Sequence, residues 1–313
     1  LGLAQMGTRD FASARTTLNR ASGMPDAVLA SSAALELARC YEFEQAWDAA
    51  SAANKELIAS TPVAWHRRQA EYALERIAAL KAMKTADPGD GLRVLPDDRT
   101  TRGDWYLSYG RSYYNLCAHN FRMDRVGGPG PRLDVRFSTS DPKEPSRLWV
   151  SDVDDPDPAA LHDPVRRTRV SANRDDRGEQ YALGKGPDLV MEADIPAGTH
   201  LLSLYFVNDH NYYEPSRRYT VSVCEAGALV ALTEVRDFGG GVYKRFRVTG
   251  PRSLAFRVHR DISLNVLLWG VFLDADCPSQ PPPIAVSSVA RDAWAESEDL
   301  RVDTFRASGN GGQ

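Results

Sequence analysis

The spacing of apolar side chains changes once along the chain and divides it into two halves. Residues 1–86 are dominated by Ala, Leu, Glu and Arg, which lose little conformational entropy in a helix, and they lack Val-rich alternation. From about Val94 to Asp276, apolar and polar positions mostly alternate, as in "LDVRFS" and "RRYTVSV". The pattern predicts a helical domain over 1–86 and an antiparallel β-sandwich over 95–277.

Two segments that disrupt regular structure frame the strand-rich half. The segment "DPGDGLRVLPDD", from Asp87 to Asp98, is rich in Pro, Gly and Asp, residues that end helices and form turns. After Cys277 the run "PSQPPP" is typical of a stiff spacer. We therefore expect residues 278–313 to form a Pro-rich linker and a weakly helical or disordered tail.

Charge and motif content exclude several classes of protein. The net charge is −4, so the chain lacks the basic surface that phosphate backbones require, and we expect no nucleic-acid partner. No apolar run is long enough to predict a transmembrane segment. The chain has no G-x-S-x-G, H-E-x-x-H or C-x-x-C motif, so we expect no enzyme. Paired carboxylates for glycoside hydrolysis stay open, because they meet only in space.

Small residues recur at a fixed spacing in the helical half. Two expected helices, joined by a turn, carry the positions Ala4, Gly7, Phe11, Ala14, Leu18, Ala21 and Pro25. Ala38 follows Ala4 by 34 residues, and Ala46 and Ala53 repeat the seven-residue step of the first pair of helices. This pattern resembles the helical hairpins of tetratricopeptide repeats. An ordinary helical bundle with alanine-rich contacts is the alternative.

A third helix is expected to close the helical array. It begins with Thr61 as N-cap and Pro62 as its first residue, which are common choices at those two positions. Stacked helix pairs present a surface that suits peptides or neighbouring proteins. The resemblance therefore implies a protein partner that contacts the helical repeats.

Four stretches of the second half follow one another in a recognisable order. They are "DDRTTRGDWYLSYGRSYYNL" (97–116), "HLLSLYFVND" (200–209), "VRDFGGGVYKRFRVTG" (235–250) and "ISLNVLLWGVFLDA" (262–275). Their order resembles the galactose-binding-domain-like β-sandwiches, which include malectin-like and carbohydrate-binding modules appended to bacterial glycosidases. The resemblance implies a jelly roll that binds carbohydrate or a cell surface and leaves catalysis to another domain.

Aromatic and polar residues at strand ends are candidates for a ligand site. Sugars offer C–H faces that stack on aromatic rings and hydroxyls that need donors and acceptors. The candidates are Trp105, Tyr106, Asn208, Asp209, Tyr212, Tyr213 and Arg217. As alternatives, the aromatic rings fill the floor of the sandwich and the arginine pairs with acidic loops.

An acidic run and two cysteines suggest structural stabilisation. Asp152, Asp154 and Asp155 in "SDVDDPDP" are weak candidates for a structural calcium ion, with a solvated loop as the alternative. We expect no other cofactor. Cys117 and Cys277 are a candidate disulfide, because the first and last strands of the sandwich should be neighbours, although four unpaired thiols stay open. A disulfide would imply an exported protein, at the cell surface, outside the cell or in the periplasm.

These features lead to one leading interpretation and two alternatives. The leading interpretation is a non-catalytic binding or assembly protein, with helical repeats for protein contact and a sandwich for carbohydrate or cell-surface binding. The first alternative is a structural subunit of an extracellular or cell-surface assembly, and self-association of the chain stays open. The second alternative is an accessory part of a glycoside hydrolase.

Overall fold

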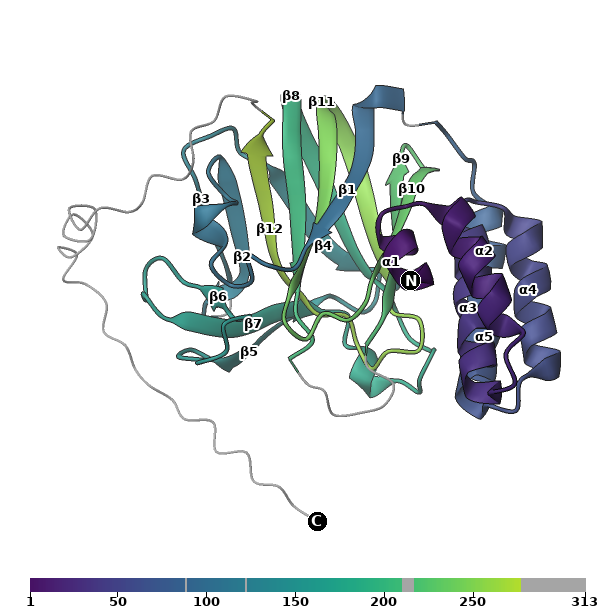
Figure 1. The fold of residues 1–313 in the computed structure, drawn as a ribbon. Coiled ribbons are helices and arrows are strands. Elements are labelled where there is room, and N and C mark those ends of the chain that lie inside the picture. Colours follow the sequence, from purple (N-terminus) through teal and green to yellow (C-terminus); the bar gives the residue numbers. More distant parts are fainter. Residues whose placement is uncertain (88, 122, 210–216, 277–313) are drawn as a thin grey trace, which may run out of the picture. The chain divides into compact units, whose positions relative to one another are not determined.

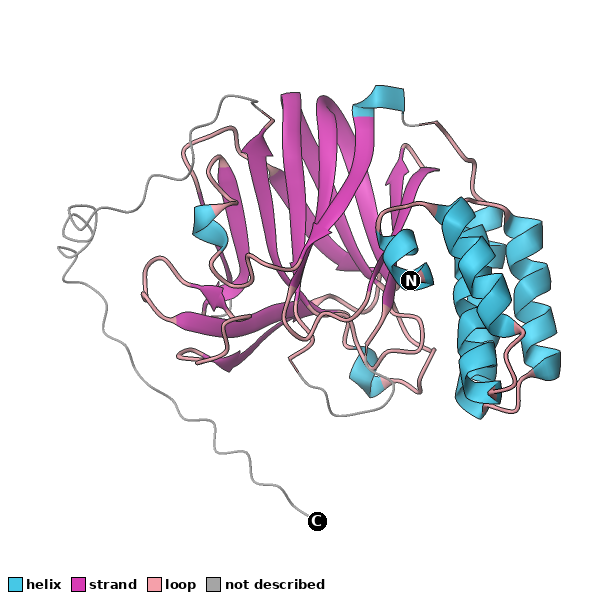
Figure 2. Cartoon of the chain, in the orientation of Figure 1, coloured by secondary structure: helices cyan, strands magenta, loops and turns pink. Residues whose placement is uncertain are grey.

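The computed structural model describes residues 1–276 except for 88, 122 and 210–216 (Figure 1). Helices come first in the chain and strands follow (Figure 2). The α-helices are α1 (Gly2–Gly7), α2 (Phe11–Ser22), α3 (Ala27–Phe43), α4 (Trp47–Ser60) and α5 (Ala64–Lys81). The predicted linker and tail lie outside the described residues.

Aspartate side chains begin two of the helices. Asp10 accepts a hydrogen bond from the Ser13 N–H at the start of α2, and Asp26 accepts from two N–H groups at the start of α3. The third expected helix is present as α5, but it begins at Ala64 because the Thr61 hydroxyl accepts from the Val63 N–H and forms a turn there. The all-α start of the chain is confirmed, whereas tetratricopeptide hairpins are not.

The strands form one antiparallel sheet in the described part of the chain. They are β1 (Leu92–Asp98), β2 (Tyr113–Asn120), β3 (Met123–Gly127), β4 (Asp134–Thr139), β5 (Arg147–Asp152), β6 (Leu161–His162), β7 (Arg169–Asp175), β8 (Leu189–Phe206), β9 (Tyr219–Glu225), β10 (Ala228–Val235), β11 (Val242–His259) and β12 (Leu268–Ala275). The main order is β10-β9-β11-β8-β12-β2-β3, and β1 and β4 add to β11 and β8.

Two long strands, β8 and β11, turn the sheet back on itself (Figure 1). Residues 199–206 of β8 pair with 242–249 of β11 and lie beside β12, whereas the first half of β8 lies beside β4. The two halves therefore face each other in a sandwich-like arrangement around an apolar core. Leu202, Phe246 and Phe256 are buried in this core.

The interval between Ser138 and Gly186 differs from its prediction. The sequence predicts long loops with one short strand near Trp149. That strand is present as β5, but the structure also has β6 and β7, which were not predicted. Val170 and Ala172 of β7 pack in a small apolar cluster, and its polar residues are paired with side chains remote in sequence. A local pattern therefore could not distinguish this strand from a charged loop.

The helices pack directly against the strands. Met6, Phe43 and Leu80 of the helical segment share an apolar cluster with Leu229 and Leu232 of β10. The described helices and strands belong to one compact unit, and the predicted domain boundary stays a prediction. No helix in the described residues is long and apolar enough to cross a membrane.

Candidate functional site

Asp98 fixes the conformation of the aromatic segment that follows β1. Its Oδ1 accepts hydrogen bonds from the Thr100 and Thr101 N–H groups, at 2.8 and 3.2 Å. Its Oδ2 accepts from the Tyr109 hydroxyl at 2.7 Å. These bonds fold residues 98–109 over the sheet and hold Tyr109 against the ring of Tyr243, at 4.1 Å between centroids.

The structure separates the two aromatic candidates of this segment. Trp105 is only 3% exposed, its Nε1 donates to the His162 carbonyl at 2.8 Å, and its ring packs on Phe272. Tyr106 is 38% exposed and lies beside His162. Trp105 therefore packs as the alternative interpretation expects, while Tyr106 lies at the surface.

Three of the predicted ligand residues come together at the end of β8. The Arg217 Nη1 contacts the Asn208 Oδ1 at 2.7 Å and the Asp209 Oδ1 at 3.4 Å. The Arg217 Nε donates to the Asn265 Oδ1 at 3.0 Å, a contact that the sequence did not predict. We call Asn208, Asp209, Arg217 and Asn265 the Arg217 cluster. Arg217 and Asn208 are buried, so hydrogen bonds within the cluster hold the Arg217 side chain.

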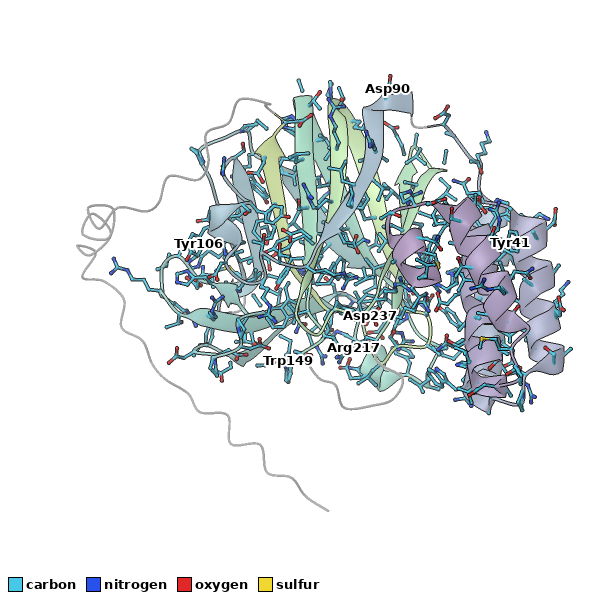
Figure 3. The ribbon with its side chains drawn as sticks, in the orientation of Figure 1. Tyr41, Asp90, Tyr106, Trp149, Arg217 and Asp237 are labelled. Atoms are coloured by element: carbon cyan, nitrogen blue, oxygen red, sulfur yellow. The ribbon has the colours of Figure 1, made fainter. Side chains whose placement is uncertain are left out.

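Among the described candidates, the aromatic and the polar residues do not form one continuous site. Figure 3 shows Tyr106 and Arg217 on different parts of the sheet domain. Tyr212 and Tyr213, which the sequence placed beside the polar candidates, lie outside the described residues. The Arg217 cluster is therefore the part of the predicted site that the structure brings together.

A buried carboxyl group that the sequence did not single out lies beneath this cluster. Asp176 Oδ1 accepts from the Val266 N–H at 3.1 Å and from the Gly178 N–H at 2.9 Å. Its Oδ2 has no hydrogen-bond partner in the described residues, and the nearest cation, Arg260 Nε, is 3.9 Å away. Burial raises the pKa of Asp176 to about 7.

Asp176 and Arg217 are linked through the segment before β12. The Tyr219 hydroxyl donates to the Asn265 carbonyl at 2.9 Å, and the Leu267 N–H donates to the same hydroxyl. Asp176 thus binds the main chain at Val266. The preceding residue, Asn265, accepts a hydrogen bond from Arg217 through its side chain. The adjacent aspartates of "NRDD" are the available sequence signal, but they resemble any acidic turn.

The acidic run folds into a series of tight turns. Asp152 Oδ1 accepts from the Asp154 N–H at 3.0 Å, and Asp155 accepts from the Asp157 N–H and from the Ser171 hydroxyl. Across residues 1–276 with their gaps, no three His, Cys, Asp or Glu side chains are grouped to hold a metal ion. The calcium site stays a prediction.

The disulfide also stays a prediction. Cys117 is fully buried in the apolar core on β2, and burial raises the pKa of its thiol. Cys277 lies outside the described residues.

A serine, a histidine and an aspartate lie in line between the sheet and the helices. The Ser222 Oγ is 2.8 Å from the His259 Nε2, and the His259 Nδ1 is 3.2 Å from the Asp188 Oδ2. This order of groups matches a hydrolytic triad. However, Ser222 is 1% exposed, so a substrate does not reach it in this fold.

Comparisons with known proteins find a low similarity to a glycan-degrading enzyme. No protein-family model and no curated protein sequence matches the chain. Solved structures of an exo-beta-1,3-galactanase from Phanerochaete chrysosporium, with beta-1,3-galactotriose or with galactose, share 13% identity and a TM-score of 0.26. The aligned part covers 48–50% of this chain and only 30–32% of the enzyme.

These neighbours are glycoside hydrolases, so the leading sequence interpretation is wrong. The leading interpretation, a non-catalytic binding or assembly protein, fits the comparison less well than the second alternative, an accessory part of a glycoside hydrolase. A TM-score of 0.26 assigns neither an activity nor a substrate to this chain.

Proposed function

We propose that this chain is the accessory part of a glycoside hydrolase and that its sheet domain contacts glycan at the Arg217 cluster. The observation that carries the proposal is the convergence of Asn208, Asp209 and Arg217 at the end of β8. Asn208 and Asp209 follow β8 and Arg217 precedes β9, and Asn265, which precedes β12, joins them from a position 48 residues away from Arg217 in the sequence.

The cluster has the chemistry that sugar hydroxyl groups require. A guanidinium supplies several donors, and amide and carboxylate oxygens supply acceptors. Because Arg217 is held by Asn208 and Asn265, its rotamer is fixed before a ligand arrives, which lowers the entropic cost of binding. Asp176 supports this arrangement from below. An unpaired oxygen on a buried carboxyl group is costly, and Asp176 carries one at this end of the sheet.

Glycan binding is tested by titration calorimetry with β-1,3-galactotriose and, for comparison, cellotriose and chitotriose. We expect at least one trisaccharide to bind, and we expect Asn208→Ala to weaken that binding by at least tenfold, because it removes the acceptor that orients Arg217. Asn19→Ala, an exposed position on α2, is the matched control and should bind as the unchanged chain does. Equal affinities of the two variants, or no binding to any trisaccharide, would refute the proposed contact.

A second measurement separates an accessory role from catalysis by the chain itself. The trisaccharides are incubated with the chain, and released monosaccharide is quantified by chromatography. We expect none, because an accessory part contributes binding and leaves bond cleavage to another domain. Release of monosaccharide by the chain alone would replace the accessory role with a catalytic one.

A further inference from the structure

A groove runs along the outer edges of β1 and β10. It consists of two adjoining cavities of about 550 and 390 Å³ that share Gly7, Arg9 and Phe43 in their walls. The smaller cavity lies beside residues 92–94 and 230–232, and the larger one continues beside 94–97 and 233–237. We call this feature the edge groove. It follows both strands for most of their length, so its shape suits an extended chain.

Both strands that border the edge groove are edge strands. In the described part of the chain, β1 pairs only with β11, and the ladder of β10 is made with β9. The outer edge of β10 accepts extended main chain at one place: Leu229 N–H donates to the Lys84 carbonyl at 2.8 Å, and Ala86 N–H donates to the Leu229 carbonyl at 3.0 Å. From residue 230 onward, no described main-chain segment continues this pairing, and the Leu232 carbonyl accepts from the Arg9 Nη1 at 3.1 Å.

A lysine in the groove has N–H donors without an acceptor among the described residues. The Lys244 side chain is 4% exposed, and its Nζ contacts Asp97, which is its one hydrogen-bond partner among the described residues. An ammonium group carries three N–H donors, so two of them have no acceptor there. Burial lowers the pKa of Lys244, as expected for an ammonium group that is poorly solvated.

The lining of the groove is more basic than the rest of the chain. Five cationic residues, Arg9, Arg93, Arg99, Arg236 and Lys244, line it against three carboxylates, Asp97, Glu234 and Asp237. Glu234 is also paired with Arg39 and Arg218, which lie outside the groove. Because the whole chain carries a net charge of −4, this local excess of positive charge favours an acidic ligand.

We propose that the edge groove binds an extended, acidic peptide segment of a partner protein. The peptide main chain would continue the pairing on β10 beyond Leu229, and one of its carboxylates would accept from Lys244. This is strand addition to a sheet edge, in which main-chain hydrogen bonds give affinity and the side-chain contacts give specificity. The inference does not depend on the proposed glycan contact, because the Arg217 cluster contributes no residue to the groove.

The test is fluorescence anisotropy with a labelled octapeptide of alternating valine and glutamate, acetylated at its N-terminus. Its matched counterpart alternates valine and lysine. We expect the acidic peptide to bind at least tenfold more tightly than the basic one, and we expect added salt to weaken its binding. Lys244→Met should weaken the binding of the acidic peptide by about tenfold, because the substitution removes a charge-assisted hydrogen bond.

Gly7→Trp keeps the test valid even if Lys244→Met fails to fold. A Cβ atom at Gly7 meets no other atom within 4 Å, so a larger side chain can project into the groove without a clash. Gly23→Trp, at the end of α2 and outside the groove, is the matched control. We expect Gly7→Trp to abolish peptide binding and Gly23→Trp to leave it unchanged. Binding that survives Gly7→Trp, equal binding of both peptides, or displacement of the acidic peptide by β-1,3-galactotriose would overturn the proposal.

Discussion

The two faces of β9 are equally buried but are stabilised by different chemistry. On one face Tyr219, Val221 and Val223 are fully buried in the apolar core of the sheet. On the other face Thr220 accepts a hydrogen bond from Arg39 at 3.2 Å and donates to Asp261 at 3.1 Å. A shift of one residue along the strand thus changes an apolar environment into an ionic one.

The ionic face extends into the helices. Arg76 of α5 donates to both carboxylate oxygens of Glu42 at 2.7 Å and also contacts Asp261. Arg218 of the sheet side pairs with Glu36 of α3 and with Glu234 of β10. Apolar side chains can repack in several ways, but buried charges are stable only where each one finds its partner. The difference teaches that one face of β9 contributes to the core of the sheet, whereas the ionic face joins β9 to the helices, in addition to the apolar cluster that the helices form with β10.

Loss of one buried charge should give the largest effect. Arg76→Met leaves Glu42 and Asp261 buried without their shared partner, and we expect the free energy of unfolding to fall by about 3–5 kcal/mol. Urea unfolding of the full chain, followed by circular dichroism, measures this change.

A double variant shows whether the loss comes from the unpaired charge. Arg76→Met combined with Glu42→Leu removes both charges of the main pair, while Asp261 keeps Arg39 at 3.6 Å. We expect it to regain most of the lost stability, because a buried ion pair contributes little net free energy over apolar residues of similar size. A double variant as unstable as the single one would mean that shape, and not charge, decides the packing of the helices.

A cavity in the apolar core is the next largest perturbation. Leu202 is fully buried in β8 between the two halves of the sheet, and Leu202→Ala should cost about 3 kcal/mol. This loss should not change with pH, because no charge is involved. The loss in Arg76→Met, by contrast, should depend on pH, because protonation can neutralise the buried Glu42 carboxylate that has lost its partner. A pH-dependent loss in Leu202→Ala would show that the two faces do not respond independently.

The same contrast explains what the sequence could predict. Alternation in "RRYTVSV" indicates that Tyr219, Val221 and Val223 share a buried face, and the structure agrees. The same alternation predicts that Thr220 and Ser222 lie on a polar face of the strand that is exposed to solvent. Their burial depends on Arg39 and Asp261, residues distant in sequence, so no local signal could predict it.

In the candidate site, too, some residues could be predicted from the sequence and others could not. Asn208, Asp209 and Arg217 were predicted because they follow or precede strong strands, and a strand end is a place where side chains converge. Asp176 was not predicted, because its burial and its unpaired oxygen depend on Val266 and on Arg260. Sequence thus locates the polar groups of a site but not the environment that changes their pKa.

Asp176 allows a prediction of pH dependence, because its carboxyl group is buried without a full set of partners. Burial raises the pKa of Asp176 to about 7, although the Val266 N–H and Arg260 oppose this effect. In the unfolded chain the pKa of an aspartate is about 3.9. Between about pH 4 and about pH 7 the folded chain therefore holds a proton that the unfolded chain has lost. The contribution of the Asp176 carboxyl group to the free energy of unfolding is complete at low pH and is lost as the pH rises to about 7.

Asp176→Asn should remove this dependence. The amide oxygen can still accept from the Val266 and Gly178 N–H groups, and no charge forms on it. At pH 7 to 8 we expect the variant to be more stable than the unchanged chain by on the order of 1–3 kcal/mol, with no gain near pH 4. Thermal unfolding of both proteins between about pH 4 and about pH 8 measures this difference in stability. A constant difference at all pH values would show that ionisation of Asp176 is not its cause.

The smallest effect should come from an ionic group that lies in water. Arg136 on β4 contacts Asp134 at 2.7 Å, Asp194 at 2.8 Å and Glu192 at 3.3 Å, so it has three carboxylate partners where Arg76 has two, but its side chain is 50% exposed. Water solvates both charges whether or not they pair, and salt screens them. We therefore expect Arg136→Met to leave the melting temperature unchanged within error, although Arg76→Met removes the same group. If the two variants lose similar stability, then burial is not what distinguishes the ionic face of β9 from an exposed group of ion pairs.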